Sequence, residues 1–194
     1  MNSLIIVNKY NSLEKNYIPL DMEYINVDVD VADEKKFMRY IAVIHLRKMF
    51  MEAKLQGISL VGISAFRSYL RQQQLYTESL QKNGIEYTKK YIAYPGTSEH
   101  QTGFAIDISC KKINNKLKEE FADTKEGIWI LNNCYKYGYI IRYPYGYERI
   151  TGYNFEPWHI RYIGIQHSLN MNKHQIKTLE EYKQYLKTKS YGKY

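Results

Sequence analysis

Two short segments of the chain carry side chains that could together bind a metal ion and activate a water molecule. The first segment contains His100 and Asp107, in the run S-E-H-Q-T-G-F-A-I-D-I. The second contains Glu156 and His159, in the run F-E-P-W-H-I-R-Y. Two histidines and one carboxylate are a common ligand set of catalytic zinc sites, and they leave a fourth position for water. A further carboxylate nearby can take the proton from that water.

This interpretation requires that His100 and Asp107 reach the same point, although they are seven residues apart. On an unbroken strand these two side chains would point to opposite faces, because the side-chain period is two. Gly103 can break the register, since glycine permits a turn or a bulge. We therefore expect both residues to bind zinc together with His159. The alternative is that His100 lies in a loop and Asp107 is hydrogen-bonded to backbone.

The second segment is unlike the helical metalloprotease motif H-E-x-x-H. Pro157 indicates that the segment is not the interior of a helix. We expect a loop that runs into a strand, with Glu156 on the loop and His159 on the strand. In that position Glu156 could act as the general base without binding the metal.

Arg67 is a third candidate, because it lies where an apolar run passes into a polar, helix-like segment. A guanidinium group at such a junction can hold a substrate carboxylate or stabilise the oxyanion of a tetrahedral intermediate. The alternative is an exposed arginine at the start of a helix. The sequence around Arg67 does not distinguish these two.

The elements that would position these side chains are a mixture of helices and strands without a regular βαβ alternation, which predicts an α+β fold. At 194 residues the chain fits a single domain, 1–194. The run T-L-E-E near the end is a capping box that should start a helix. We expect an extended segment at 1–32, helices from Asp33 to Gly57, from Ser68 to Gly84, over 127–137 and over 178–188, and strands at 58–65, at 98–108, at 139–143 and at 158–164.

The composition excludes several classes of protein. The net charge of +8 permits anionic partners, but no Lys/Arg block or recognition motif indicates nucleic-acid binding. Cys110 and Cys134 are not in a C-x-x-C pair, so free thiols are the simplest interpretation and one disulfide is optional. No signal peptide and no run of about 18 apolar residues is present. We therefore expect a cytoplasmic protein, or one of the cell envelope if an export segment has been removed.

The two segments resemble the paired signatures of the VanY-type zinc D-alanyl-D-alanine carboxypeptidases, S-x-H-x-x-G-x-A-x-D and E-x-W-H-x-R-Y-x-G. The likeness extends to I-V-N-K, F-R-S-Y-x-x-Q, Y-G-Y-I-I-R-Y-P, I-T-G-Y and T-L-E-E-Y, and so covers nearly the whole chain. It implies a small antiparallel sheet flanked by helices, the fold shared by lysostaphin-type peptidases, D-Ala-D-Ala peptidases and the hedgehog signalling domain.

The resemblance also implies roles for single residues. It assigns zinc binding to His100, Asp107 and His159, the general base to Glu156, and stabilisation of the transition state to Arg67.

Three more side chains acquire a role only through the resemblance. It implies that Ser98 and Gln72 help to hold the terminal residue of the substrate. Trp158 would line the pocket, although on sequence alone it could equally belong to the core.

The chain departs from the family pattern just before Arg67. The usual S-G-Y-R is here S-A-F-R, so Phe66 lacks the tyrosine hydroxyl group and any hydrogen bond that it makes. Dipeptidase and dual-activity relatives tend to carry aspartate where this chain has Ser64. An aspartate could bind the free ammonium group of a dipeptide, whereas Ser64 would contact a substrate without requiring that charge. This favours carboxypeptidase action on a longer peptide.

The expected activity is the removal of the C-terminal D-Ala from peptidoglycan precursors or stem peptides that end in D-Ala-D-Ala. Two alternatives use the same machinery: a dual D,D-dipeptidase and D,D-carboxypeptidase of glycopeptide resistance, and an L,D-carboxypeptidase acting on tetrapeptide stems. A non-catalytic zinc module is a different class, and the presence of Glu156 argues against it, because a structural site needs no base. We expect a monomer or a homodimer.

Overall fold

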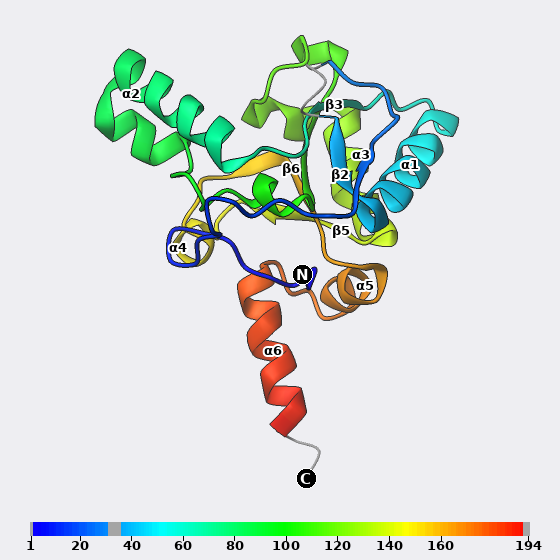
Figure 1. The fold of residues 1–194 in the computed structure, drawn as a ribbon. Coiled ribbons are helices and arrows are strands. Elements are labelled where there is room, and N and C mark those ends of the chain that lie inside the picture. The colour runs from blue at the N-terminus through cyan, green and yellow to red at the C-terminus, as the bar shows by residue number, and fades with distance from the viewer. Residues whose placement is uncertain (1, 31–35, 192–194) are drawn as a thin grey trace.

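The computed structural model describes residues 2–30 and 36–191. Its centre is a four-stranded antiparallel sheet in the order β3-β4-β6-β5, beside a two-stranded sheet of β1 and β2. This agrees with the predicted α+β class (Figure 1). The strands are β1 (Met22–Tyr24), β2 (Phe37–Arg39), β3 (Val61–Ser64), β4 (Ala105–Ser109), β5 (Tyr139–Tyr143) and β6 (Glu156–Tyr162).

The helices lie around the sheet. In Figure 1, α1 and α3 lie on one side, α2 reaches out on the other, and α6 extends away toward the C-terminus. Short 3-10 turns connect several of the elements, among them η2 (Glu99–Thr102), η4 (Glu119–Asp123) and η5 (Cys134–Tyr137). The α-helices are α1 (Tyr40–Leu55), α2 (Tyr69–Tyr91), α3 (Lys125–Asn133), α4 (Glu148–Thr151), α5 (Ile165–Lys173) and α6 (Leu179–Tyr191).

The central sheet has an apolar face and a polar face, as strand periodicity requires. Ile106, Ile108 and Ile160 are fully buried and belong to the core that α1 and α3 complete. Burial of each such side chain stabilises the fold by about 1.5–3 kcal/mol. Asp107 and His159 are next to these isoleucines in the sequence, so their side chains point to the opposite face, where the candidate site lies.

A second apolar cluster fixes the N-terminal segment and the last two helices against the edge of the sheet. The predicted capping box is confirmed: the backbone N–H of Glu181 donates to Thr178 Oγ1, and that of Thr178 donates to Glu181 Oε2. The helix that it starts, α6, runs to Tyr191, somewhat beyond the predicted end. The core members of this cluster are Leu4, Ile140, Ile163, Met171, Leu179 and Tyr182.

Two helix predictions need correction. The predicted cap Asp33 lies outside the described residues, and Phe37–Arg39 form strand β2, so the helix begins only at Tyr40. Pairing of β2 with β1 has overridden the helical periodicity there. Ser68 caps α2 as predicted, but the chain continues as helix beyond Gly84, where the backbone turns through a φ of 79°. The short helices α4 and α5 were not predicted.

The expectation of free thiols agrees with the structure. Cys110 and Cys134 are both buried free thiols. Within the described part of the chain, no helix has the length and apolar character needed to cross a membrane.

Candidate active site

Strands β4 and β6 place two of the predicted ligands side by side. Asp107 and His159 are direct partners in the antiparallel register, so their side chains emerge next to each other on the polar face. His159 Nδ1 lies 3.0 Å from Asp107 Oδ1. Both side chains are almost completely buried. The pairing of two strands that are far apart in the sequence thus joins the two predicted segments.

The 3-10 turn η2 brings in the third predicted ligand. Gly103 ends the turn in the left-handed conformation, with a φ of 72°, and the chain then enters β4. This places His100 Nε2 at 3.2 Å from Asp107 Oδ2. The predicted break at Gly103 is confirmed, although it is a turn before a short strand and not a bulge within a long one.

Substitution of Gly103 by alanine should lower the free energy of unfolding and weaken metal binding. The left-handed conformation alone costs an L-residue about 1–2 kcal/mol. In addition, a Cβ atom at Gly103 would lie 2.9 Å from Arg39 Cγ, so the turn that carries His100 would have to shift. Gly57→Ala is a matched control, because Gly57 has a similar φ of 73° and no atom lies within 4 Å of the point that a Cβ would occupy there. Chemical denaturation should show a larger loss for Gly103→Ala; equal losses would contradict the role of crowding.

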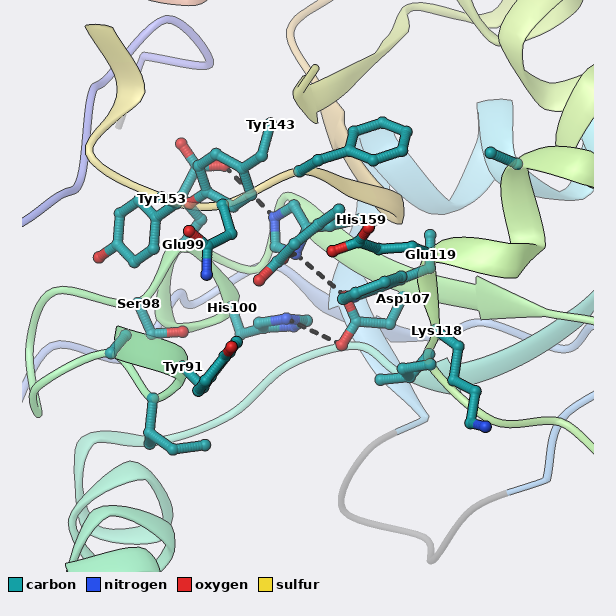
Figure 2. A pocket seen from close by; sticks show the side chains of 18 of the residues that line it. Tyr91, Ser98, Glu99, His100, Asp107, Lys118, Glu119, Tyr143, Tyr153 and His159 are labelled. Carbon is teal, nitrogen blue, oxygen red and sulfur yellow. Dashed lines mark hydrogen bonds and ion pairs between the residues drawn. The ribbon is translucent and has the colours of Figure 1, made fainter. Parts of the chain in front are cut away.

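The three side chains offer a suitable donor set for a metal ion. Among the described residues, His100, Asp107 and His159 form a cluster whose ligand atoms lie within 4.8 Å of one another. Nδ1 of His100 donates to the carbonyl oxygen of Ala65 at 2.6 Å, which leaves Nε2 unprotonated and directed toward Asp107. Figure 2 shows the three side chains converging in the cavity. Two imidazole nitrogens and a carboxylate oxygen fit zinc.

The charges within this cluster favour the ionised form of Asp107. Burial alone would raise the pKa of Asp107, but the charges and hydrogen bonds of His100 and His159 hold that pKa well below its usual range. Burial lowers the pKa of His100. Burial acts in the same direction on His159, but its contacts with Asp107 and Glu99 raise the pKa of that imidazole to about 9. Asp107 is therefore a carboxylate at neutral pH.

Glu156 lies beside the cluster but outside it. Its Oε2 atom is 3.8 Å from His159 Nδ1, and its side chain is 24% exposed. Burial raises the pKa of this carboxyl group to about 7, so it can both accept and return a proton near neutral pH. The expected loop position was wrong, because Glu156 is the first residue of β6. An irregularity in the pairing with β5 accommodates Pro157 within that strand.

Arg67 follows β3 and reaches the same point from the other side. Its Nη2 atom is 3.9 Å from Asp107 Oδ2. Nη1 donates to Gln72 Oε1 at 2.8 Å, and Nη2 donates to Ser64 Oγ at 3.2 Å. Gln72 in turn donates to the carbonyl oxygen of Ala93. Ser64 and Gln72 are buried and hold Arg67, and the substrate contact expected of both residues stays a prediction.

A cavity of about 980 Å³ lies over these residues. Trp158 lines it, as the resemblance implied, and so do Ser98, His100, Asp107 and His159. Tyrosines of α2 and acidic residues of η4 form its outer walls, namely Tyr87, Tyr91, Glu119, Glu120 and Asp123. The cavity therefore extends well beyond the metal-binding cluster.

One charged group at the site was not predicted from the sequence. The side chains of Glu99, Arg142 and Arg161 are fully buried behind His159, and both arginines contact Glu99. Arg142 and Arg161 lie in the otherwise apolar runs Y-I-I-R-Y and W-H-I-R-Y. A charged residue in such a run is costly to bury unless it is paired, and this signal could have indicated the group.

Comparisons with known proteins agree with this geometry. A model of the family described as VanY, D-alanyl-D-alanine carboxypeptidase, matches residues 35–165. The dual D-Ala-D-Ala dipeptidase and carboxypeptidase VanXYC of Enterococcus gallinarum is 36% identical over 193 residues, which cover 96% of each protein.

Two solved structures extend the likeness to the fold. The LD-carboxypeptidase LdcB matches with a TM-score of 0.87 and 40% identity, over 94% of this chain and 86% of that one. A variant of the vancomycin-resistance D,D-pentapeptidase VanY, in complex with Zn(II), matches with a TM-score of 0.74 and 30% identity, over 93% of this chain and 98% of that one.

Proposed function

This chain belongs to the VanY family of D-alanyl-D-alanine carboxypeptidases, and we propose that it releases the C-terminal D-alanine from peptidoglycan stem peptides in a zinc-dependent reaction. One observation carries the proposal. Ligand atoms of His100, Asp107 and His159 converge next to Glu156 and Arg67 at the floor of a large cavity.

The metal would be held by Nε2 of His100, Nδ1 of His159 and a carboxylate oxygen of Asp107. The VanY neighbour that contains Zn(II) supports the choice of zinc. Bound here, zinc supplies Lewis acidity, which polarises a carbonyl group and lowers the pKa of a water molecule.

The protein side chains supply the proton transfers and the remaining charge. Glu156 takes a proton from the water whose oxygen attacks the scissile carbonyl carbon. When the carbon–nitrogen bond breaks, Glu156 returns the proton to the amine of the leaving D-alanine. Arg67, held by Ser64 and Gln72, directs its guanidinium group to the negative charge on the carbonyl oxygen.

The dimensions of the cavity favour a substrate longer than a dipeptide. At about 980 Å³ it lies at the upper end of the range of small-molecule sites. Position 64 offers Arg67 only the hydroxyl group of Ser64. The free ammonium group of D-Ala-D-Ala would therefore find no carboxylate at that position to bind it. We propose that the main substrate is a stem peptide that ends in D-Ala-D-Ala.

A second candidate is release of D-alanine from a tetrapeptide stem by cleavage of an L,D bond. The observation that favours it is the likeness to LdcB, whose TM-score of 0.87 and identity of 40% exceed those of the zinc-containing VanY neighbour. The same metal cluster, base and arginine serve either reaction, since both release the same amino acid.

An assay of D-alanine release from the dipeptide, the tetrapeptide and the pentapeptide tests these proposals. We expect kcat/KM for at least one stem peptide to exceed that for D-Ala-D-Ala by about tenfold or more, because an unpaired buried ammonium group costs over 1 kcal/mol. A chelator should abolish all release, and added zinc should restore it. Equal efficiency on the dipeptide would instead assign the dual activity, and chelator-resistant release would contradict a zinc enzyme.

A further inference from the structure

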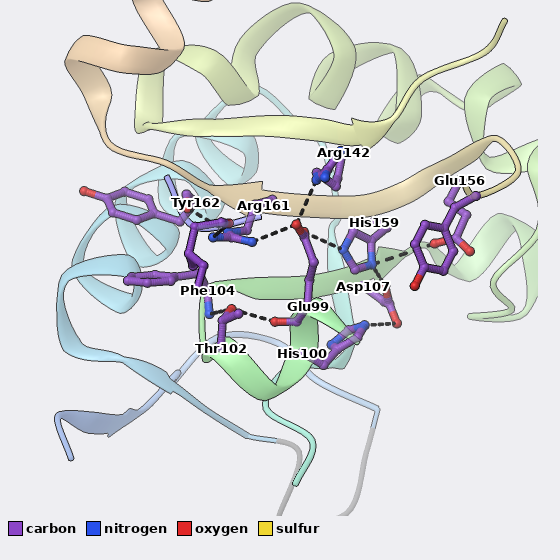
Figure 3. Close-up of polar contacts among 12 residues, drawn as sticks. Glu99, His100, Thr102, Phe104, Asp107, Arg142, Glu156, His159, Arg161 and Tyr162 are labelled. Carbon is purple, nitrogen blue, oxygen red and sulfur yellow. Dashed lines mark hydrogen bonds and ion pairs between the residues drawn. The ribbon is translucent and has the colours of Figure 1, made fainter. Parts of the chain in front are cut away.

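Glu99 is a fully buried carboxylate that directs its two oxygens to different partners. Oε1 accepts a hydrogen bond from Arg142 Nε at 2.8 Å and lies 2.8 Å from Arg161 Nη1. Oε2 lies 3.6 Å from His159 Nε2 (Figure 3). The carboxylate therefore separates the two guanidinium groups from the imidazole ring.

The contact between Glu99 and His159 brings together two buried polar atoms that have no other hydrogen-bond partner. Neither Glu99 Oε2 nor His159 Nε2 has a hydrogen-bond partner within bonding distance. Buried polar atoms are rarely left unpaired in proteins. The opposite nitrogen of the ring, Nδ1, faces Asp107 at 3.0 Å. A small shift of the ring toward Glu99 would complete a hydrogen bond between the two unpaired atoms.

We propose that Glu99 is a positioning residue for the metal centre, which keeps the proton of His159 on Nε2 and so leaves the Nδ1 lone pair free for the metal. The inference rests on the proposed zinc-dependent function. A carboxylate can only accept a hydrogen bond from the ring, so the nitrogen that faces it must carry the proton. Hydrogen bonds to the non-ligating nitrogen set the tautomer and the orientation of metal-binding histidines in this way.

The two arginines hold Glu99 in the required orientation. Because both guanidinium groups contact Oε1, the carboxylate is fixed with Oε2 toward His159. Arg142 is itself held by a two-pronged contact with Glu180 of α6. Arg161 donates to the backbone carbonyl oxygens of Ser3 and Ile5.

The arrangement is electrically balanced. The positive charges of Arg142 and Arg161 are matched by the negative charges of Glu99 and Glu180. Both arginines lie 2.8 Å from Oε1 of Glu99. Two guanidinium groups thus face the Glu99 carboxylate, and through them the C-terminal helix and the N-terminal segment both contribute to holding the ligand His159.

Glu99→Gln is the most direct test. It keeps the shape of the side chain and replaces the oxygen that faces His159, a hydrogen-bond acceptor, by an NH₂ donor. The amide oxygen should stay with the two arginines, which can only donate. The amide NH₂ group would then face His159 Nε2, so the ring would have to accept there and carry its proton on Nδ1. We expect zinc affinity, measured by competition with a chromophoric chelator, to fall by about 10–100-fold.

Nuclear magnetic resonance gives a readout that a merely structural role would not change. Long-range proton–nitrogen spectra of ¹⁵N-histidine protein distinguish protonated, unprotonated and zinc-bound ring nitrogens. In the zinc-loaded wild-type protein we expect His159 to have a protonated Nε2 and a zinc-bound Nδ1. Zinc bound to Nε2 would overturn the inference without any variant, so the test does not depend on the folding of Glu99→Gln.

Glu126→Gln is the matched control, since Glu126 is another buried glutamate and does not line the cavity. It should leave zinc affinity unchanged. Unchanged zinc affinity in Glu99→Gln, while the wild-type protein binds one zinc ion, would overturn the inference alone. Failure of the wild-type protein to bind zinc would instead overturn the proposed function on which the inference rests.

Discussion

Replacement of Glu156 by glutamine should lower kcat for D-alanine release by about 10²–10⁴-fold, the usual contribution of a general acid–base group. Glutamine has nearly the same shape, but its amide group cannot take a proton from water or return one to the leaving amine. Glu156 lies 3.8 Å from His159 Nδ1, outside the cluster of ligand atoms. Zinc content, measured by atomic absorption on the dialysed protein, should therefore stay at the wild-type value.

The combination of lost turnover and retained metal distinguishes a base from a ligand. Glu148→Gln provides a control, because Glu148 lies on α4 and its carboxylate accepts from the backbone N–H of Gly146. That variant should keep wild-type kcat. Retained activity in Glu156→Gln would contradict the assignment of the base, and loss of zinc would show that Glu156 is a ligand.

Part of the metal-binding cluster could be predicted from the sequence, because the relation of His100 to Asp107 depends on local rules. The side-chain period of a strand posed the problem of His100 and Asp107, and Gly103 offered the solution. The pairing of β4 with β6 supplied the third ligand, His159, but that pairing is a long-range contact. The spacing of residues indicated which donors to consider, and only the folded chain could bring them together.

The predictions that the structure corrects or leaves open depend on long-range pairing or on the direction of a side chain. Gln72 and Ser64 are expected to contact substrate, and in the structure both bind Arg67; no local pattern in the sequence indicates that contact. Phe37–Arg39 follow the helical periodicity of α1, yet they pair with β1, and the free energy of that pairing outweighs local propensity.

The group around Glu99 shows a different limit. Glu99 stands next to a predicted ligand, but its role depends on Arg142 and Arg161, which lie on two other strands. The sequence shows only that these three charged residues occur in segments that are expected to be buried. Pairing makes their burial tolerable, and pairing is visible only in three dimensions.

Replacement of Arg67 by lysine should lower kcat/KM by about 10²–10³-fold, the effect of removing one oxyanion-stabilising donor. Arg67 uses both terminal nitrogens of its guanidinium group, one to Gln72 and one to Ser64. A lysine keeps the charge but has a single ammonium group, which cannot satisfy both partners and also reach the substrate. The variant therefore separates the contribution of the positive charge to kcat/KM from that of the orientation of the guanidinium group.

Arg71→Lys is the matched control on the helix that follows Arg67, because Arg71 lies in the first turn of α2, donates to Gln74 and lies near Glu78. It should leave kcat/KM within about twofold of wild type, because Arg71 is not among the residues that line the cavity. Gln72→Ala should fall between the two arginine variants, since it preserves the charge of Arg67 and removes one of the two groups that orient it. If Arg67→Lys and Arg71→Lys had the same kcat/KM, the arginine would have no part in the reaction, and the guanidinium group beside Asp107 would serve only to balance that carboxylate.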